Sequence, residues 1–90
     1  MSTKVVHCKR HKYDIYIGRP GIWGNPFSIG RDGTRQQVID KYREFINGTS
    51  NKAKELKLQL HTLKGKTLGC WCSPQACHGD VLAELADSIS

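Results

Sequence analysis

Residues 66–89 read KTLGCWCSPQACHGDVLAELADSI. This segment changes from a strand-like to a helix-like pattern, and the fold can be inferred from that change. The first part, Lys66–Cys72, has the short apolar character of a buried strand. After a polar loop, apolar residues recur at helical spacing, as Val81, Leu82, Leu85, Ala86 and Ile89. We expect Asp80 to cap this helix, which should span residues 80–88. A buried strand that leads through a loop into an amphipathic helix is typical of an α/β domain with a partly parallel sheet.

Two β-prone stretches lie near the start of the chain. Val5–Val6 is apolar, and Tyr13–Ile17 alternates apolar and polar residues. The polar run between them, His7–Lys12, should face solvent or a ligand. Together with the strand at 66–72, these stretches predict a small sheet of three or four strands.

Two further helices are predicted in the middle of the chain. Thr34 and Gln37 form a capping box that should begin a helix over residues 34–47. A second helix should span residues 51–63. Its buried face should consist of Ala53, Leu56, Leu60 and Leu63. The elements predict a single α/β domain over residues 1–90, with about three helices.

The composition limits the class of protein. The chain has 90 residues, of which 38% are hydrophobic and 24% charged, as in an ordinary globular domain. No apolar run approaches the length of roughly 20 residues that a membrane span needs. Because no secretory signal is legible either, we expect a cytoplasmic protein.

Positive charge dominates the chain and is unevenly distributed. Fourteen Lys and Arg residues against eight Asp and Glu give a formal net charge of +6. All of the basic residues lie at or before Lys66, whereas Asp80, Glu84 and Asp87 follow it. A basic body attracts phosphate-rich partners, such as a nucleotide, a nucleic acid or an acidic protein.

A long loop rich in glycine and proline, residues 18–33, is the most informative segment for binding. Together with the start of the following helix it supplies three kinds of group suited to a nucleotide. These are Arg19, Arg31 and Arg35 for phosphate, Trp23 and Phe27 for stacking, and Asn25 and Asp32 for base edges or ribose hydroxyls. The alternative is a packed Ω-loop in which the two aromatic rings fill the core and the arginines face water.

The loop before the last helix is a second candidate for binding anions. A helix N-terminus presents backbone N–H groups and the positive end of the helix dipole. We expect the ligand contacts here to come from Cys77, His78, Gly79 and Asp80. Gly79 would allow a ligand to approach the backbone closely. In the alternative, Asp80 only caps the helix and Gly79 only forms a turn.

The cysteines leave three possibilities open. Cys70, Cys72, Cys77 and His78 are four soft ligands within nine residues, which suits zinc, although their spacing differs from that of paired CxxC motifs. The second possibility, which we favour over zinc, is burial of Cys70 as a small apolar residue. Cys77 with His78 could instead form a catalytic pair, because a thiol at a helix N-terminus beside an imidazole is easily ionised.

Three motifs carry a resemblance to a known family. They are VVHCKR (Val5–Arg10), GRPGIWGNPFSIGRDGTR (Gly18–Arg35) and GCWCSPQACHGDVLAEL (Gly69–Leu85). In them the chain resembles domain of unknown function 4326, a family common in bacteriophages and also found in bacteria. The last motif is also similar to a second uncharacterised family, in which an arginine stands at the position of Gly79. That second resemblance implies a Rossmann-like domain.

These observations lead to three hypotheses on function. The first is a phage-type protein that binds a phosphorylated, nucleotide-like small molecule without a cofactor; the family's distribution suggests that it sequesters or cleaves a host nucleotide signal. The second is a zinc-stabilised protein that binds nucleic acid. The third is a nucleotide-processing enzyme that depends on Cys77 and His78. Because so small a domain hardly encloses a nucleotide, we also expect that two copies could share a pocket in a homodimer.

Overall fold

The three short strands of the protein lie parallel, with the last one in the centre of the sheet. The computed structural model describes residues 2–73 and 75–89. Its elements are β1 (Lys4–His7), β2 (Ile15–Tyr16), α1 (Arg35–Ile46), α2 (Asn51–Gln59), a 3₁₀ turn at Leu60–Thr62, β3 (Thr67–Cys70) and α3 (His78–Asp87). The strand order is β1-β3-β2, and both neighbours pair with β3 in parallel. The predicted α/β domain with about three helices is therefore confirmed.

The register of the sheet decides which side chains share a face. Val5 and Ile15 both lie opposite Leu68, and Leu68 is fully buried. Val6 and Tyr16 both lie opposite Gly69, so these residues share the other face. The strand predicted at 13–17 is shorter than expected, because Asp14 and Ile17 continue the pairing only by single hydrogen bonds to the carbonyls of Thr67 and Gly69.

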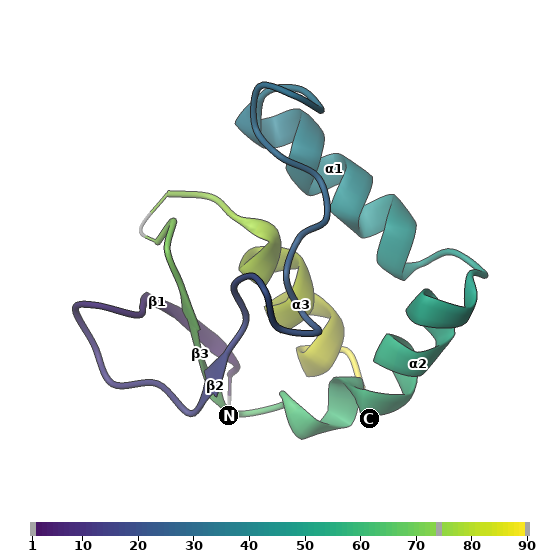
Figure 1. Ribbon diagram of the computed structural model, residues 1–90. Coiled ribbons are helices and arrows are strands. Elements are labelled where there is room, and N and C mark those ends of the chain that lie inside the picture. Colours follow the sequence, from purple (N-terminus) through teal and green to yellow (C-terminus); the bar gives the residue numbers. More distant parts are fainter. Residues whose placement is uncertain (1, 74, 90) are drawn as a thin grey trace.

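The helices lie on one side of the sheet, and the connection of residues 8–14 lies on the other (Figure 1). The core forms between the sheet and the helices. Its fully buried side chains include Ile17, Tyr42, Ile46, Leu56, Leu63, Leu68, Val81 and Leu82. Burial of each such side chain contributes about 1.5–3 kcal/mol to folding. This two-layer arrangement leaves one face of the sheet without a helix.

The middle helices begin where their caps predict. The side-chain oxygen of Thr34 accepts from the backbone of Gln37, whose side chain in turn accepts from the backbone of Thr34. Ser50 caps α2 in the same way, by accepting from the backbone of Ala53. The second helix ends earlier than the predicted residue 63, because its last turn tightens into the 3₁₀ turn. The four apolar residues predicted to be buried there are all buried.

The start of α3 differs from the prediction. Helix α3 begins at His78, and its N-cap is Cys77 rather than Asp80. The Sγ atom of Cys77 accepts a hydrogen bond from the backbone of Gly79 at 3.2 Å. The carboxylate of Asp80 reaches back to the backbone N–H of Cys77 at 3.1 Å. Asp80 thus lies in the first turn of the helix and forms the second half of a capping box with Cys77.

The strand predicted over residues 66–72 is also shorter than expected. Strand β3 ends at Cys70, so Trp71 and Cys72 lie in the turn that follows. Within residues 2–73 and 75–89, no helix combines the length and apolar character that crossing a membrane requires.

Candidate functional site

A cleft lies at the carboxyl ends of β2 and β3, where open parallel sheets commonly bind ligands. Its volume is about 120 Å³, and one side is open to solvent. Three segments far apart in the sequence form it. They are the loop after β2 with the start of α1 (Gly18, Arg19, Asn25, Phe27, Ile29, Arg35, Val38, Ile39), the end of β3 (Cys70, Trp71, Cys72), and the start of α3 (Ala76, Cys77, His78).

Two of the three predicted arginines line this cleft. Arg19 donates from Nη1 to the hydroxyl of Ser28 at 2.9 Å. Arg35 donates from Nη1 to the carbonyl of Ala76 at 3.2 Å, across the gap between α1 and α3. In the described part of the chain, neither guanidinium forms an ion pair with a carboxylate. Both therefore keep donors that are available to an anion.

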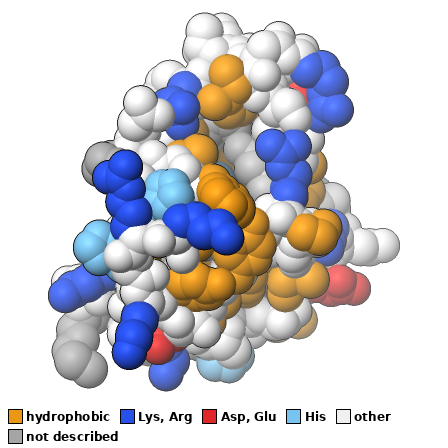
Figure 2. All heavy atoms as spheres, turned by 60° about the vertical axis from the view of Figure 1, so that its left-hand side comes forward, with side chains coloured by type: hydrophobic (Ala, Val, Ile, Leu, Met, Phe, Trp, Pro, Cys, Tyr) orange, Lys and Arg blue, Asp and Glu red, His pale blue; other side chains and the backbone are white. Residues whose placement is uncertain are grey.

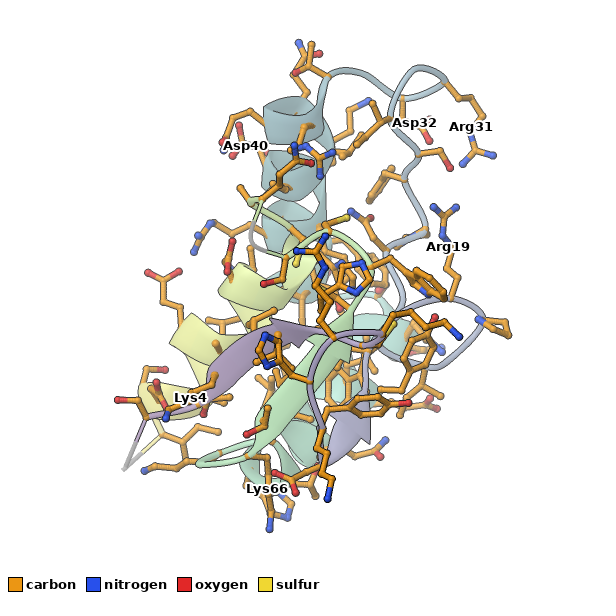
Figure 3. The ribbon with its side chains drawn as sticks, turned by 90° about the vertical axis from the view of Figure 1, so that its left-hand side faces the viewer. Lys4, Arg19, Arg31, Asp32, Asp40 and Lys66 are labelled. Carbon is orange, nitrogen blue, oxygen red and sulfur yellow. The ribbon has the colours of Figure 1, made fainter. Side chains whose placement is uncertain are left out.

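Arg31, the third predicted arginine, is not part of the cleft. Its guanidinium donates from Nε to the carboxylate of Asp32 at 2.9 Å and from Nη2 to the carbonyl of Pro26 at 2.9 Å. In Figure 3, Arg31 lies beside Asp32 at the outer end of the loop, whereas Arg19 lies nearer the sheet. Arg31 therefore does not line the cleft with Arg19 and Arg35 in this conformation, because its bonds to Asp32 and Pro26 hold the guanidinium at the outer end of the loop.

The polar residues predicted to contact a base or ribose, Asn25 and Asp32, shape the loop, and Asn25 also lines the cleft. Asp32 accepts from the backbone of Ser28 at 2.8 Å. This bond and the bond from Arg31 hold the pKa of Asp32 below its ordinary value. Asn25 is buried; it donates from Nδ2 to the carbonyl of Val38 at 3.2 Å and accepts from the backbone of Phe27 at 2.9 Å. These bonds fix the loop to the start of α1.

The two predicted stacking residues have different positions. Trp23 is only 5% exposed and belongs to the core, and its carbonyl accepts from the hydroxyl of Tyr42 at 2.9 Å. Its ring therefore cannot stack on a ligand, as the Ω-loop alternative anticipated. Phe27 is half-buried and lines the cleft. Of the two rings predicted to stack on a ligand, only the ring of Phe27 therefore lines the cleft.

Trp71 is a cleft residue that the sequence prediction missed. Its side chain is 55% exposed, and its indole donates to the hydroxyl of Tyr16 at 2.7 Å. The prediction placed it inside a strand that in fact ends one residue earlier. Its position at the carboxyl end of a parallel strand was the available signal, because ligands of such sheets bind there.

Cys70 and Cys77 form a buried pair of thiols against the cleft. Their Sγ atoms lie 3.2 Å apart. The hydrogen bond from Cys77 lowers the pKa of Cys70 to about 6. The same bond, together with burial, raises the pKa of Cys77 well above its ordinary value. These directions favour Cys70 as the thiol that ionises first, and the role of Cys77 as the nucleophile stays a prediction.

His78 is held by the sheet. Its Nε2 atom lies 2.7 Å from the carbonyl oxygen of Ile17, so Nε2 carries the proton and donates it. Burial lowers the pKa of His78 below its ordinary value of 6.5, which keeps the ring neutral at pH 7. The ring also packs edge-on against Tyr42, at 5.1 Å between ring centroids. His78 thus has a structural role, and it also lines the cleft.

Gly79 and Asp80 make structural contacts at the start of helix α3. A Cβ atom at Gly79 would lie 2.7 Å from Cδ1 of Ile17 and 3.0 Å from Cγ1 of Val5. Glycine is therefore required for close packing of α3 on the sheet. Since Gly79 donates to Cys77 and Asp80 accepts from it, part of the helix N-terminus is already occupied. Neither residue lines the cleft.

The four residues proposed as zinc ligands all line the cleft, but they are not arranged to hold a metal ion together. Among residues 2–73 and 75–89 there is no group of three or more Cys, His, Asp or Glu side chains placed to hold a metal ion. Cys70 and Cys77 are paired, but Cys72 packs against the edge of the core and His78 Nε2 is bound to Ile17. Among the described residues, the side chains of the zinc alternative therefore do not form a set of metal ligands.

The comparison with protein families gives one match. The family described as Domain of unknown function (DUF4326) matches residues 4–88. The chain belongs to this family. The matched range contains every residue that lines the cleft of this DUF4326 protein.

Two viral proteins are relatives of this DUF4326 protein. An uncharacterised 12.4 kDa protein from the nrdA–td intergenic region of enterobacteria phage T4 is 31% identical over 87 residues, which cover 96% of this chain and 79% of the relative. An uncharacterised protein of Acanthamoeba polyphaga mimivirus is 33% identical over 105 residues, which cover 90% of this chain and 77% of the relative. No solved structure matches the chain.

Proposed function

We propose that this DUF4326 protein binds a phosphorylated, nucleotide-like small molecule in the cleft between the loop after β2, the end of β3 and the start of α3. The observation that carries this proposal is the pair Arg19 and Arg35. They approach the cleft from different elements, and neither is neutralised by a carboxylate among the described residues. Two guanidinium groups at one cleft are suited to a phosphate, which they can bind through paired hydrogen bonds.

The size of the cleft limits which part of the ligand it encloses. Whole small-molecule sites typically measure about 300–1,000 Å³, so a cleft of about 120 Å³ admits only part of a nucleotide. We place the phosphate between Arg19 and Arg35. The base then lies at the open rim, where Trp71 and Phe27 offer ring faces for stacking.

The test is a titration with a nucleotide series. Adenosine and guanosine with zero, one, two or three phosphates would be titrated by isothermal calorimetry. We expect affinity to rise with phosphate number, and Arg35→Gln or Arg19→Gln to weaken binding by about tenfold or more, since a hydrogen bond to a charged group contributes about 1.5–3 kcal/mol.

The matched control is Arg31→Gln, which removes an arginine from the same loop but outside the cleft. It should keep full affinity. Equal binding of the unphosphorylated nucleosides, or full affinity in Arg35→Gln, would contradict the phosphate assignment. Native mass spectrometry of the same samples would show whether one ligand is held by one chain or by two.

Turnover of the ligand is a second candidate, favoured by the low pKa of Cys70 at the cleft. A thiolate at neutral pH is a nucleophile. Under this candidate, Cys70→Ser abolishes product formation while nucleotide binding remains. If Cys70→Ser leaves product formation unchanged, the thiol has no catalytic role; if the unaltered protein forms no product from any nucleotide of the series, the activity is binding alone.

A further inference from the structure

The face of the sheet opposite the helices carries a second feature. This face is crossed by the connection of residues 8–14, seen on the left of Figure 1. The register places Val6, Gly69 and Tyr16 on it. Tyr13, from the connection, lies over Gly69, since a Cβ at that glycine would be 2.6 Å from Cγ of Tyr13. The absence of a side chain at Gly69 thus lets an aromatic ring lie flat on the sheet.

Three aromatic side chains follow one another along this face. The rings of Tyr13 and Tyr16 lie 6.2 Å apart between centroids. Tyr16 accepts a hydrogen bond from the indole of Trp71 at 2.7 Å. Tyr13 is 42% exposed and Trp71 is 55% exposed. We call Tyr13, Tyr16 and Trp71 the aromatic row; the two contacts join the three side chains, of which Tyr13 and Trp71 are exposed and Tyr16 is half-buried.

Basic side chains surround the aromatic row. Lys9, Arg10 and Lys12 are exposed on the connection, and Lys9 Nζ lies 5.4 Å from the ring centroid of Trp71. Lys4 and Lys66 extend the charge toward the other end of the sheet (Figure 3). In Figure 2, Lys and Arg side chains lie around and across the hydrophobic side chains gathered on this side. The carboxylate on the connection, Asp14, accepts from the backbone of Thr67 at 2.8 Å.

We infer that the aromatic row and its basic surround bind single-stranded nucleic acid. Unpaired bases can stack on exposed aromatic rings, and cations beside the rings attract the phosphates between the bases. A duplex offers no free base faces, and the carboxylates of an acidic peptide would use the cations but not the rings. The combination of rings and cations on one face therefore fits a single strand best.

This surface adjoins the phosphate cleft at Trp71, which belongs to both, and at Tyr16, whose hydroxyl donates to the carbonyl of Arg19 at 3.1 Å. Arg19 and Arg35 are not part of it, and Lys9, Arg10, Lys12 and Tyr13 do not line the cleft. The inference therefore does not depend on the proposed nucleotide ligand. Variants that avoid Trp71 can separate the two sites.

The experiment measures binding of a fluorescent oligothymidylate of about 15 nucleotides with hydroxyl ends, a length near the upper limit of known single-domain sites. The variant is Lys9→Gln with Lys12→Gln. Its matched control is Lys52→Gln with Lys54→Gln, which removes the same charge from exposed positions of α2. We expect this double variant, the face variant, to bind about tenfold more weakly. The slope of the logarithm of its binding constant against the logarithm of salt concentration should become shallower by about 1.4, because two phosphate contacts are lost. The control should retain the affinity of the unaltered protein.

Stacking is tested separately with Tyr13→Leu, which keeps an apolar cover over Gly69 but removes the ring. We expect several-fold weaker binding, with an unchanged thermal midpoint showing that the fold is intact. If the face variant and the α2 control bind equally, the cations do not act at this surface and the inference is overturned. Equal affinity for a duplex of the same length would also overturn it, because a duplex cannot stack on the row.

The two proposals fail in different ways. Arg35→Gln should retain the oligothymidylate and lose the nucleotide, whereas Lys9→Gln with Lys12→Gln should do the reverse. If no nucleotide binds at all, the oligothymidylate result still decides the second surface. If Arg35→Gln loses the oligothymidylate as strongly as the face variant does, the strand binds in the cleft and the separate surface is disproved.

Discussion

The Sγ atoms of Cys70, the last residue of the central strand, and Cys77, the N-cap of helix α3, lie 3.2 Å apart. When Cys70 is ionised, Cys77 is the donor of this contact, and the sulfur of Cys77 also accepts from the backbone of Gly79. The pair thus joins strand β3 to α3 and stabilises a thiolate at the edge of the cleft.

Replacing Cys77 should raise the pKa of Cys70. In Cys77→Ala the hydrogen bond that lowers the pKa of Cys70 to about 6 is lost, while burial continues to favour the neutral thiol. Ultraviolet absorbance of the thiolate, followed during a pH titration, measures the change. The control is Cys8→Ala, which removes a thiol outside the pair. An unchanged titration in Cys77→Ala would show that Cys77 does not stabilise the thiolate.

The same ionisation should make the unaltered protein more stable as the pH rises. The folded pKa of Cys70, about 6, is below the ordinary thiol value of 9.0. This contribution to stability is therefore complete above pH 9, where the unfolded thiol also ionises, and is lost as the pH falls toward 6. Urea denaturation at a series of pH values should show the gain, and Cys70→Ser should remove it. An equal pH dependence in Cys70→Ser would assign the effect to another group.

Removing the hydroxyl of Tyr42 should destabilise the protein. Tyr42 is fully buried and donates to the carbonyl of Trp23 at 2.9 Å. In Tyr42→Phe that carbonyl loses its partner, which costs about 1–3 kcal/mol of unfolding free energy. Chemical denaturation measures the loss. The control, Tyr13→Phe, removes a hydroxyl from a ring that is 42% exposed and should change stability by less than about 0.5 kcal/mol. Equal effects of the two changes would disprove the buried hydrogen bond.

Adding a methyl group at Gly79 should force α3 away from the sheet. The new Cβ would lie 2.7 Å from Cδ1 of Ile17, so Gly79→Ala should cost about 1–3 kcal/mol. Shortening the obstructing side chain with Ile17→Val removes that Cδ1. The double variant should therefore lose less stability than the sum of the single variants. Strict additivity would mean that the contact with Ile17 is not the cause.

The start of the chain should detach from α3 when Asp87 is neutralised. The carboxylate of Asp87 accepts from the backbone of Thr3 at 3.0 Å and from its hydroxyl at 2.7 Å, and these bonds lower the pKa of Asp87 below its ordinary 3.8. Stability from this carboxylate is present above about pH 4 and is lost as the pH falls through the lowered folded value. Asp87→Asn should lower the thermal midpoint at pH 7 and lose part of the acid sensitivity. Asp40→Asn on the exposed face of α1 is the control, and an equal effect there would refute the link to Thr3.

Local patterns in the sequence determined most of the secondary structure. The capping box of Thr34 and the apolar spacing of the two middle helices were predicted correctly, because capping and amphipathic periodicity depend on residues a few positions apart. The limits of β3 and α3 were less accurate. Cys77 replaced Asp80 as the N-cap because a buried sulfur contact with Cys70, seven residues away, holds Cys77 extended.

The sequence by itself thus determined the α/β class, the family and the presence of arginines and aromatic rings within the range that the family matches. Only the tertiary structure decided which of them share a cleft. It buried Trp23, bound Arg31 to Asp32, and placed Trp71 at the end of β3 beside Arg19 and Arg35. The physical reason is that burial and ion pairing depend on which segments the sheet brings side by side, and that information is carried by contacts across tens of residues rather than by local spacing.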